Sequence, residues 1–136
     1  MAEKSFHLEI VTPRRIVYNA PAVSFSAPGT IGGFQVLYNH APLVSSLRVG
    51  DVKVIEQDGK EIHYATSGGF VEVRDNRVTL LAETAERSDE IDVARAQAAH
   101  DRAAKRLSKG ESDVDVERAR AALARALNRL RISEVQ

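Results

Sequence analysis

The stretch VKVIEQDGKEIHYAT, residues 52–66, decides the fold class of the chain. Both halves are rich in β-branched and aromatic residues, which favour extended strands. Asp58-Gly59 stands between them, and this dipeptide is typical of the tight turn of a β-hairpin, because glycine adopts positive φ angles without strain. The stretch therefore predicts two antiparallel strands, over residues 52–57 and 61–66.

Similar short segments precede and follow this hairpin. Residues 6–10 alternate apolar and polar side chains with the period of two that buries one face of a sheet. Glycine, proline, asparagine and aspartate separate further predicted strands over residues 22–27, 34–37, 43–47, 70–74 and 78–82. Many short strands without an intervening helix indicate an antiparallel β-sandwich or barrel.

The composition changes after about residue 87, where alanine dominates and glycine nearly disappears. Asp89 is predicted to cap a first helix, with Asp92 in its first turn, where an acidic side chain complements the helix dipole. This helix is expected to run through Leu107 and to break over residues 108–111. A second helix is therefore expected to follow the break.

Ser112 and Asp115 resemble a capping box that opens this second helix, which is predicted to end near Ile132. Its apolar stripe is narrow and consists of Val116, Ala119, Leu123, Ala126 and Leu130. The comparable stripe of the first helix consists of Ile91, Ala94, Ala98 and Leu107. Because alanine buries little apolar area, at roughly 25 cal/mol per Å², the two helices should form an antiparallel hairpin that separates easily. We expect a stable β domain, residues 1–87, that carries a labile helical arm, residues 88–136.

Length and composition exclude several classes of protein. The 136 residues suffice for one small domain with an appendage, and 43% of them are hydrophobic, which supports a packed core. Nineteen basic residues balance nineteen acidic ones, which argues against a general nucleic-acid binder. Without cysteine, disulfides, thiolate metal sites and thiol nucleophiles are excluded, and a reducing compartment fits best. We expect neither a signal peptide nor a membrane-spanning segment, because no run of about 18 apolar residues exists.

Several sequence blocks, taken in their order and spacing, resemble one known family. They are LEIVTP (8–13), NHAPL (39–43), SGGFVEV (67–73), NRVTLLA (76–82) and EIDVARA (90–96). The match runs nearly end to end and is to the epsilon subunit of bacterial F-type ATP synthases. One position departs from that family, since Thr30 stands where relatives usually carry an acidic residue.

The resemblance implies an N-terminal antiparallel β-sandwich followed by a C-terminal two-helix antiparallel hairpin. It also implies a non-catalytic subunit of the central stalk, which binds the gamma subunit and the c-subunit ring and couples proton flow to ATP synthesis. The hairpin is expected to fold against the sandwich, or to extend along gamma, contact the alpha/beta catalytic subunits and inhibit ATP hydrolysis. The expected location is the cytoplasmic face of the bacterial membrane, without direct insertion. The implied subunit contacts are Gly29, Thr30, Ile31, His40, Ala41 and Pro42.

Asp92 and Arg95 have two interpretations. Residues three apart on a helix can form a surface ion pair, which stabilises the helix by about 0.2–0.5 kcal/mol. They can also belong to an anion site, because five arginines and no acid lie between residues 118 and 131, and Arg125 repels Arg129. An antiparallel hairpin is predicted to gather four guanidinium groups, which suit phosphate, towards one cleft: Arg95, Arg102, Arg125 and Arg129.

The resemblance favours the anion site. Epsilon subunits that bind ATP carry the motif Ile/Leu-Asp-x-x-Arg-Ala, which residues 91–96 match at every fixed position. The resemblance therefore implies ATP, alone or with magnesium, as a regulatory ligand, with no catalytic residue and no protein metal site. The implied ATP-binding residues are Glu86, Ile91, Asp92, Arg95, Ala96, Arg102, Arg125 and Arg129. Two alternatives stay open: a coupling subunit indifferent to nucleotide, and an unrelated β-sandwich enzyme with a helical lid.

Overall fold

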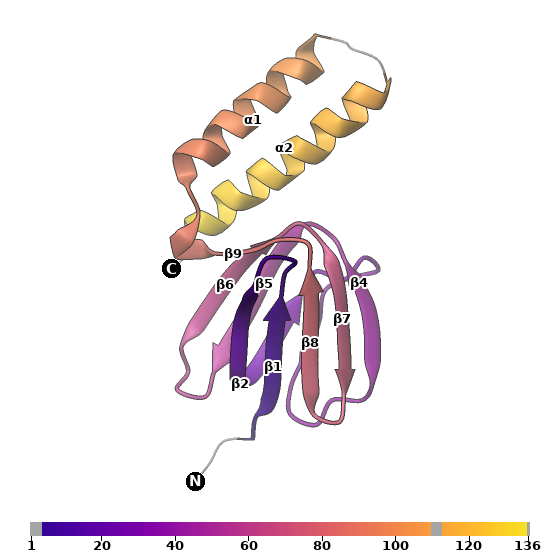
Figure 1. Ribbon diagram of the computed structural model, residues 1–136, viewed down its shortest axis with the longest axis vertical. Helices are drawn as coiled ribbons and strands as arrows, with labels where there is room; N and C mark the ends of the chain where they lie inside the picture. Colours follow the sequence, from indigo (N-terminus) through magenta and orange to yellow (C-terminus); the bar gives the residue numbers. More distant parts are fainter. Residues whose placement is uncertain (1–3, 110–112, 136) are drawn as a thin grey trace.

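The chain folds into two parts, which the computed structural model describes over residues 4–109 and 113–135. Figure 1 shows a β domain below and a pair of antiparallel helices that stand on one end of it. The predicted fold class, a β-sandwich followed by a helical hairpin, is confirmed. Among the described residues, no helix is long and apolar enough to cross a membrane.

The described residues of the β domain form nine strands. Their bounds are β1 (Phe6–Val11), β2 (Ile16–Ala27), β3 (Phe34–Val36), β4 (Leu43–Leu47), β5 (Gly50–Glu56), β6 (Glu61–Thr66), β7 (Gly69–Arg74), β8 (Arg77–Ala82) and β9 (Ala85–Arg87). The first eight overlap the predicted segments, although β2 begins well before residue 22. Sequence analysis missed β9, which pairs with β6.

The strand order is β4-β7-β8-β1-β2-β5-β6-β9, and β3 pairs with β2. Every pairing is antiparallel except that of β1 with β8, which is parallel. The expectation of a wholly antiparallel sheet is wrong at this pair, because β1 and β8 are joined by most of the β domain rather than by a tight turn. Phe25, Leu8, Ile10 and Leu80 are the largest side chains of the fully buried core between the layers.

The hairpin predicted around Asp58-Gly59 is confirmed. Strands β5 and β6 pair from Gly50 with Thr66 to Ile55 with Glu61. Gly59 adopts φ 87°, which suits glycine, and its N–H donates to the carbonyl of Glu56 at 2.9 Å. The hairpin therefore places the β5 and β6 ends that carry Gly50 and Thr66 beneath the helices (Figure 1).

The helical arm comprises a 3-10 turn, η1 (Ser88–Glu90), and helices α1 (Val93–Ser108) and α2 (Asp113–Ser133). Asp92, not Asp89, caps α1, and its carboxylate accepts the N–H of Arg95 at 3.0 Å. The prediction of Asp89 as the cap is wrong because η1 follows β9 directly and Ile91 is extended, with φ −71° and ψ 127°. The predicted capping box with Ser112 lies outside the described residues.

The buried faces of the helices agree with the predicted stripe on α2 but not on α1. On α2, Ala119 and Ala126 are buried, as predicted. On α1, Ala94 and Ala98 are exposed, whereas Ala96 and Ala103 are buried. The predicted stripe was wrong because it was counted from Ile91, which precedes the helix and does not share its periodicity. The seam between the helices is thin, since alanines fill its buried positions.

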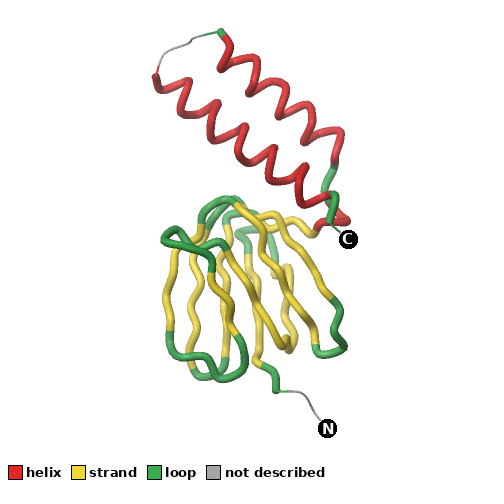
Figure 2. Tube along the Cα trace, turned by 180° about the vertical axis from the view of Figure 1, so that it is seen from behind, coloured by secondary structure: helices red, strands yellow, loops and turns green. Residues whose placement is uncertain are grey.

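The helical arm touches the β domain through the last turns of α2 (Figure 2). Asn128 is buried, and its Nδ2 donates to the carbonyl oxygens of Gly50 at 2.9 Å and Thr66 at 3.5 Å. A small buried apolar cluster, separate from the main core, consists of Ala65, Ile91 and Ile132. The docking of the arm therefore depends on few contacts compared with those inside the β domain.

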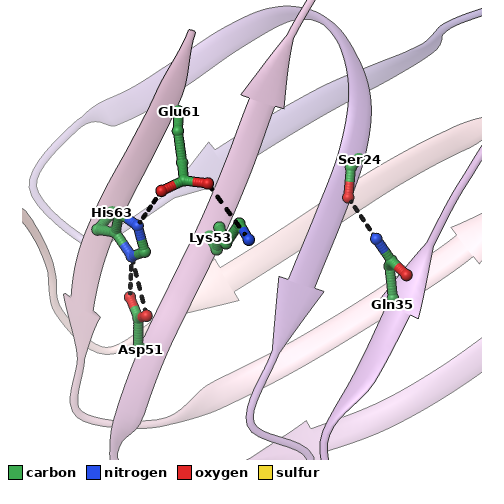
Figure 3. A network of polar contacts seen from close by, with 6 residues as sticks. All are labelled: Ser24, Gln35, Asp51, Lys53, Glu61 and His63. Atoms are coloured by element: carbon green, nitrogen blue, oxygen red, sulfur yellow. Dashed lines mark hydrogen bonds and ion pairs between the residues drawn. The ribbon is translucent and has the colours of Figure 1, made fainter. Parts of the chain in front are cut away.

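A network of charged groups lies on β5 and β6 (Figure 3). His63, only 7% exposed, contacts Asp51 at 2.9 Å through Nδ1 and Glu61 at 3.0 Å through Nε2. Lys53 Nζ lies 3.3 Å from the other oxygen of Glu61. Burial by itself would lower the pKa of His63, but the hydrogen bonds and charges of Glu61 and Asp51 raise it above the ordinary histidine value. His63 is therefore held between two carboxylates, and we assign it a structural role.

We predict that this pairing makes stability depend on pH. Because the pKa of His63 is raised in the folded state, its contribution is complete below about pH 6.5 and is lost as pH rises through the folded-state pKa. In urea unfolding between about pH 6 and about pH 9, the free energy of unfolding of the wild type should fall towards that of His63→Gln. A difference between the two proteins that stays constant over this range would contradict the pairing.

Candidate functional site

A cavity of about 550 Å³ lies where the arm meets the β domain. Its walls come from the β1–β2 turn (residues 12–15), the segment around β9 (residues 83–86), the start of α1 and the end of α2. The predicted ATP-binding residues that line it are Glu86, Asp92, Arg95, Ala96 and Arg129. The volume lies within the range of about 300–1,000 Å³ that is usual for small-molecule sites.

Asp92 and Arg95 do not form the ion pair that their spacing permits. The Asp92 carboxylate accepts the main-chain N–H of Arg95, so it serves as the helix cap. The Arg95 guanidinium is exposed and, among the described residues, has no ion pair. Capping therefore leaves this guanidinium available to an anion in the cavity.

Arg129 approaches the cavity from α2 and is held by β9. Its Nε donates to Oε1 of Glu86, and both side chains are about one-third exposed. This pair links the arm to the strand that precedes it and orients the guanidinium. The Glu86 carboxylate is therefore occupied by Arg129, and the Arg129 guanidinium is oriented before any anion enters the cavity.

The cavity as a whole has balanced charge. The cationic residues in its lining are Arg14, Arg15, Arg95 and Arg129, and the acidic ones are Glu83, Glu86, Glu90 and Asp92. Two of the acids are engaged by Arg129 and Arg15, and a third caps α1. The acids of the cavity therefore partly neutralise its arginines.

The other predicted ATP-binding residues lie elsewhere. Arg125 lines a much smaller neighbouring cavity, which shares Arg129 with the first. Arg102 is exposed on α1 and lines neither cavity. Ile91 is buried in a cluster with Ala65 and Ile132, two residues before α1 begins. The structure thus brings Arg95 and Arg129 together in one cavity and does not bring Arg102 to it.

Sequence analysis did not identify the β1–β2 turn as part of this cavity. Arg14 and Arg15 lie in a turn far from the arm in sequence, and no local pattern marks them. In the structure, Arg15 Nη2 lies 3.5 Å from the carboxylate of Glu90. Only the pairing of β1 with both β2 and β8 places this turn beside the start of the arm.

The predicted subunit contacts fall at opposite ends of the β domain. Gly29 bridges to Leu47 at the arm end, where the side chain of Ile31 is fully exposed. His40 follows Asn39, whose N–H donates to Asn76 in the β7–β8 turn at the other end. Thr30 lies beside Ser46 of β4 and Pro42 immediately precedes that strand, so β4 separates the two segments.

An exposed row of hydrophobic side chains crosses the outer face of β7, β8, β1 and β2. The cross-strand partners are Phe70 with Leu81, Leu81 with Val11, and Val11 with Ile16. Phe70, Leu81 and Ile16 are 60%, 57% and 56% exposed, and Val44 on the neighbouring β4 is 71% exposed. We call these five residues the apolar face. Contiguous exposed apolar surface of this kind is typical of a binding surface for another protein.

Within residues 4–109 and 113–135, no group of three or more carboxylate or imidazole side chains is arranged to hold a metal ion. The glycines at 29–33 form a tight turn, in which Gly32 N–H donates to Gly29 O at 3.1 Å. This turn leads into β3 rather than into a helix, so it lacks the geometry of a phosphate-binding loop.

The sequence matches one protein family along almost its whole length. Residues 5–88 match the family described as ATP synthase, Delta/Epsilon chain, beta-sandwich domain, and residues 89–134 match its long alpha-helix domain. The ATP synthase epsilon chain of Pelotomaculum thermopropionicum is 53% identical over 109 residues, which cover 80% of this chain and 81% of that protein. The ATP synthase epsilon chain of Syntrophomonas wolfei is 50% identical, over 79% of this chain and 78% of that protein.

Solved structures share the fold. One chain in the cryo-EM structure of the Euglena gracilis mitochondrial ATP synthase, OSCP/F1/c-ring in rotational state 1, has a TM-score of 0.79 at 23% identity. The match covers 91% of this chain and 78% of that chain. A chain in the central stalk/c-ring structure of the Tetrahymena thermophila mitochondrial ATP synthase has a TM-score of 0.61 at 13% identity, over 98% and 99% of the two chains. The chain belongs to the delta/epsilon chain family of the ATP synthases, as its sequence predicted, and is a non-catalytic subunit of that kind.

Proposed function

We propose that the chain is a central-stalk subunit that binds gamma and the c-subunit ring and couples proton flow to ATP synthesis. The apolar face carries this proposal, because large hydrophobic side chains at high exposure are stabilised when a partner covers them. We assign this face to gamma. Ile31 and Thr30 at one end of the β domain, and His40 to Pro42 at the other, are proposed contacts with the remaining partners. The proposed location is the cytoplasmic face of the bacterial membrane.

We predict that a charge placed within the apolar face weakens binding to gamma. Leu81→Glu should weaken binding of the full chain to gamma at least tenfold, because a carboxylate would have to be desolvated in the interface. Co-purification with gamma, or calorimetry where gamma is soluble, measures this. Val93→Glu is the matched control, since Val93 is also half exposed but lies on α1 and is not one of the five residues of the face. Equal weakening by both substitutions, or by neither, would contradict the assignment of the face.

We further propose that the arm regulates ATP hydrolysis in response to ATP. The docked arm is held by Asn128, the Glu86–Arg129 pair and a small apolar cluster, so an alternative position needs only a few kcal/mol. In the extended position, the five arginines between residues 118 and 131 would contact acidic surfaces of the alpha/beta subunits and inhibit hydrolysis. ATP would favour the docked position, because its cavity has walls on both the arm and the β domain.

The site proposed for ATP places the phosphates near Arg95 and Arg129. The predicted residues Arg102 and Arg125 would join them only after a change of side-chain position, since neither lines this cavity. Any magnesium would be carried by the phosphates, because the described residues gather no metal-binding group. ATP should be preferred to ADP because its additional charge meets the same fixed cations.

Arg95→Ala should weaken ATP binding about tenfold or more, since a charged hydrogen bond contributes about 1.5–3 kcal/mol and about 1.4 kcal/mol is a factor of ten. Isothermal calorimetry with ATP and with ADP, in the presence and absence of magnesium, measures this. Arg118→Ala is the control, because Arg118 is exposed on α2 and lines none of these cavities. If wild type and Arg95→Ala bind ATP equally, residues 90–96 are an ordinary helix start. If neither protein binds ATP, the chain is a coupling subunit without nucleotide sensing.

A further inference from the structure

The β1–β2 turn closes the cavity from the side of the β domain. Thr12 N–H donates to the carbonyl of Arg15 at 2.9 Å, and the Thr12 hydroxyl accepts the N–H groups of Arg14 at 3.4 Å and Arg15 at 3.3 Å. These bonds fix the backbone of the turn. The two arginines are therefore presented from an ordered support.

The two arginines of this turn differ in their partners. Arg15 pairs with Glu90, which lies in η1 immediately before α1. Arg14 lines the cavity, is exposed and, among the described residues, has no ion pair. Among the described residues that line the cavity, Arg14 and Arg95 are the two arginines without a carboxylate partner.

Arg14 and Arg95 stand on different parts of the molecule. Arg95 belongs to the arm, whereas Arg14 belongs to the β domain. A single carboxylate can accept one bidentate guanidinium pair, but a polyphosphate offers successive anionic groups that can engage several guanidinium groups at once. A ligand with a chain of phosphates therefore fits the distribution of charge across this cavity better than a monoanion.

We propose that Arg14 is a further phosphate-binding residue, so that the β domain completes the nucleotide site of the arm. This proposal rests on the proposed binding of ATP. Undocking of the arm carries Arg95 and Arg129 away from Arg14, and only the docked arrangement presents all three. The ligand then binds the docked arrangement more tightly than the undocked one and stabilises docking by the same factor. The arm alone is an incomplete site.

The test uses the full chain and calorimetric titration with ATP. Arg14→Ala should weaken ATP binding about tenfold, which corresponds to about 1.4 kcal/mol. Its melting temperature without ATP should equal that of the wild type, because Arg14 is exposed and its side chain has no ion pair within the described residues. Arg77→Ala is the matched control, since Arg77 is an exposed arginine at the start of β8, outside the cavity.

Three results would overturn the proposal, and they are distinguishable. If Arg95→Ala weakens binding but Arg14→Ala and Arg77→Ala both bind as wild type does, the arm binds ATP without the β domain. If the wild type does not bind ATP, the proposed nucleotide sensing fails together with this inference. Equal weakening by Arg14→Ala and Arg77→Ala would indicate a general effect of charge and would also contradict a contact at Arg14.

Discussion

The side-chain amide of Asn128 joins the two parts of the molecule, and the behaviour of the arm depends on it. Its Nδ2 reaches the carbonyl oxygens of Gly50 and Thr66, which form a cross-strand pair at the end of β5 and β6. A hydrogen bond of this kind contributes about 0.5–1.5 kcal/mol net, but leaving a buried polar group unpaired costs about 1–3 kcal/mol. These bonds thus define the geometry of docking well, but they stabilise the docked position by only a modest free energy. We propose that an arm held in this way can leave the β domain while the core of that domain stays intact.

Much of the fold could be predicted because its signals are local. The Asp58-Gly59 turn and the alternation in residues 6–10 mark strands through chemistry that neighbouring residues carry themselves. The parallel pairing of β1 with β8 has no local signal, since it follows from closing the β domain. Asp89 and Asp92 are equally good caps by residue type. Asp92 is the cap because the residues before Ile91 belong to β9, which pairs with β6, and to η1. The division at residues 87 and 88 stays a prediction, although β9 ends at Arg87.

The candidate site was predictable only on the arm. The motif at 91–96 predicted Asp92 and Arg95, which line the cavity with Arg129, because a helix start carries its own pattern. The β1–β2 turn could not be found in this way, since Arg14 comes near the arm only through strand pairing. The apolar face was missed for a related reason. Phe70 and Leu81 read as ordinary strand residues, and only the sheet shows that nothing within the described residues covers them.

We propose that ATP strengthens a weak docking of the arm on the β domain. Because the chain has no cysteine, two can be introduced for spin labels at the exposed positions Lys60, on the β5–β6 turn, and Ser108, at the end of α1. Pulsed electron paramagnetic resonance then measures the distribution of distances between the two spin labels, in this protein and in its Asn128→Ala variant. We expect ATP to narrow the distribution to one docked distance, and Asn128→Ala without ATP to broaden it. Distributions that are identical with and without ATP, and unaffected by Asn128→Ala, would contradict this proposal.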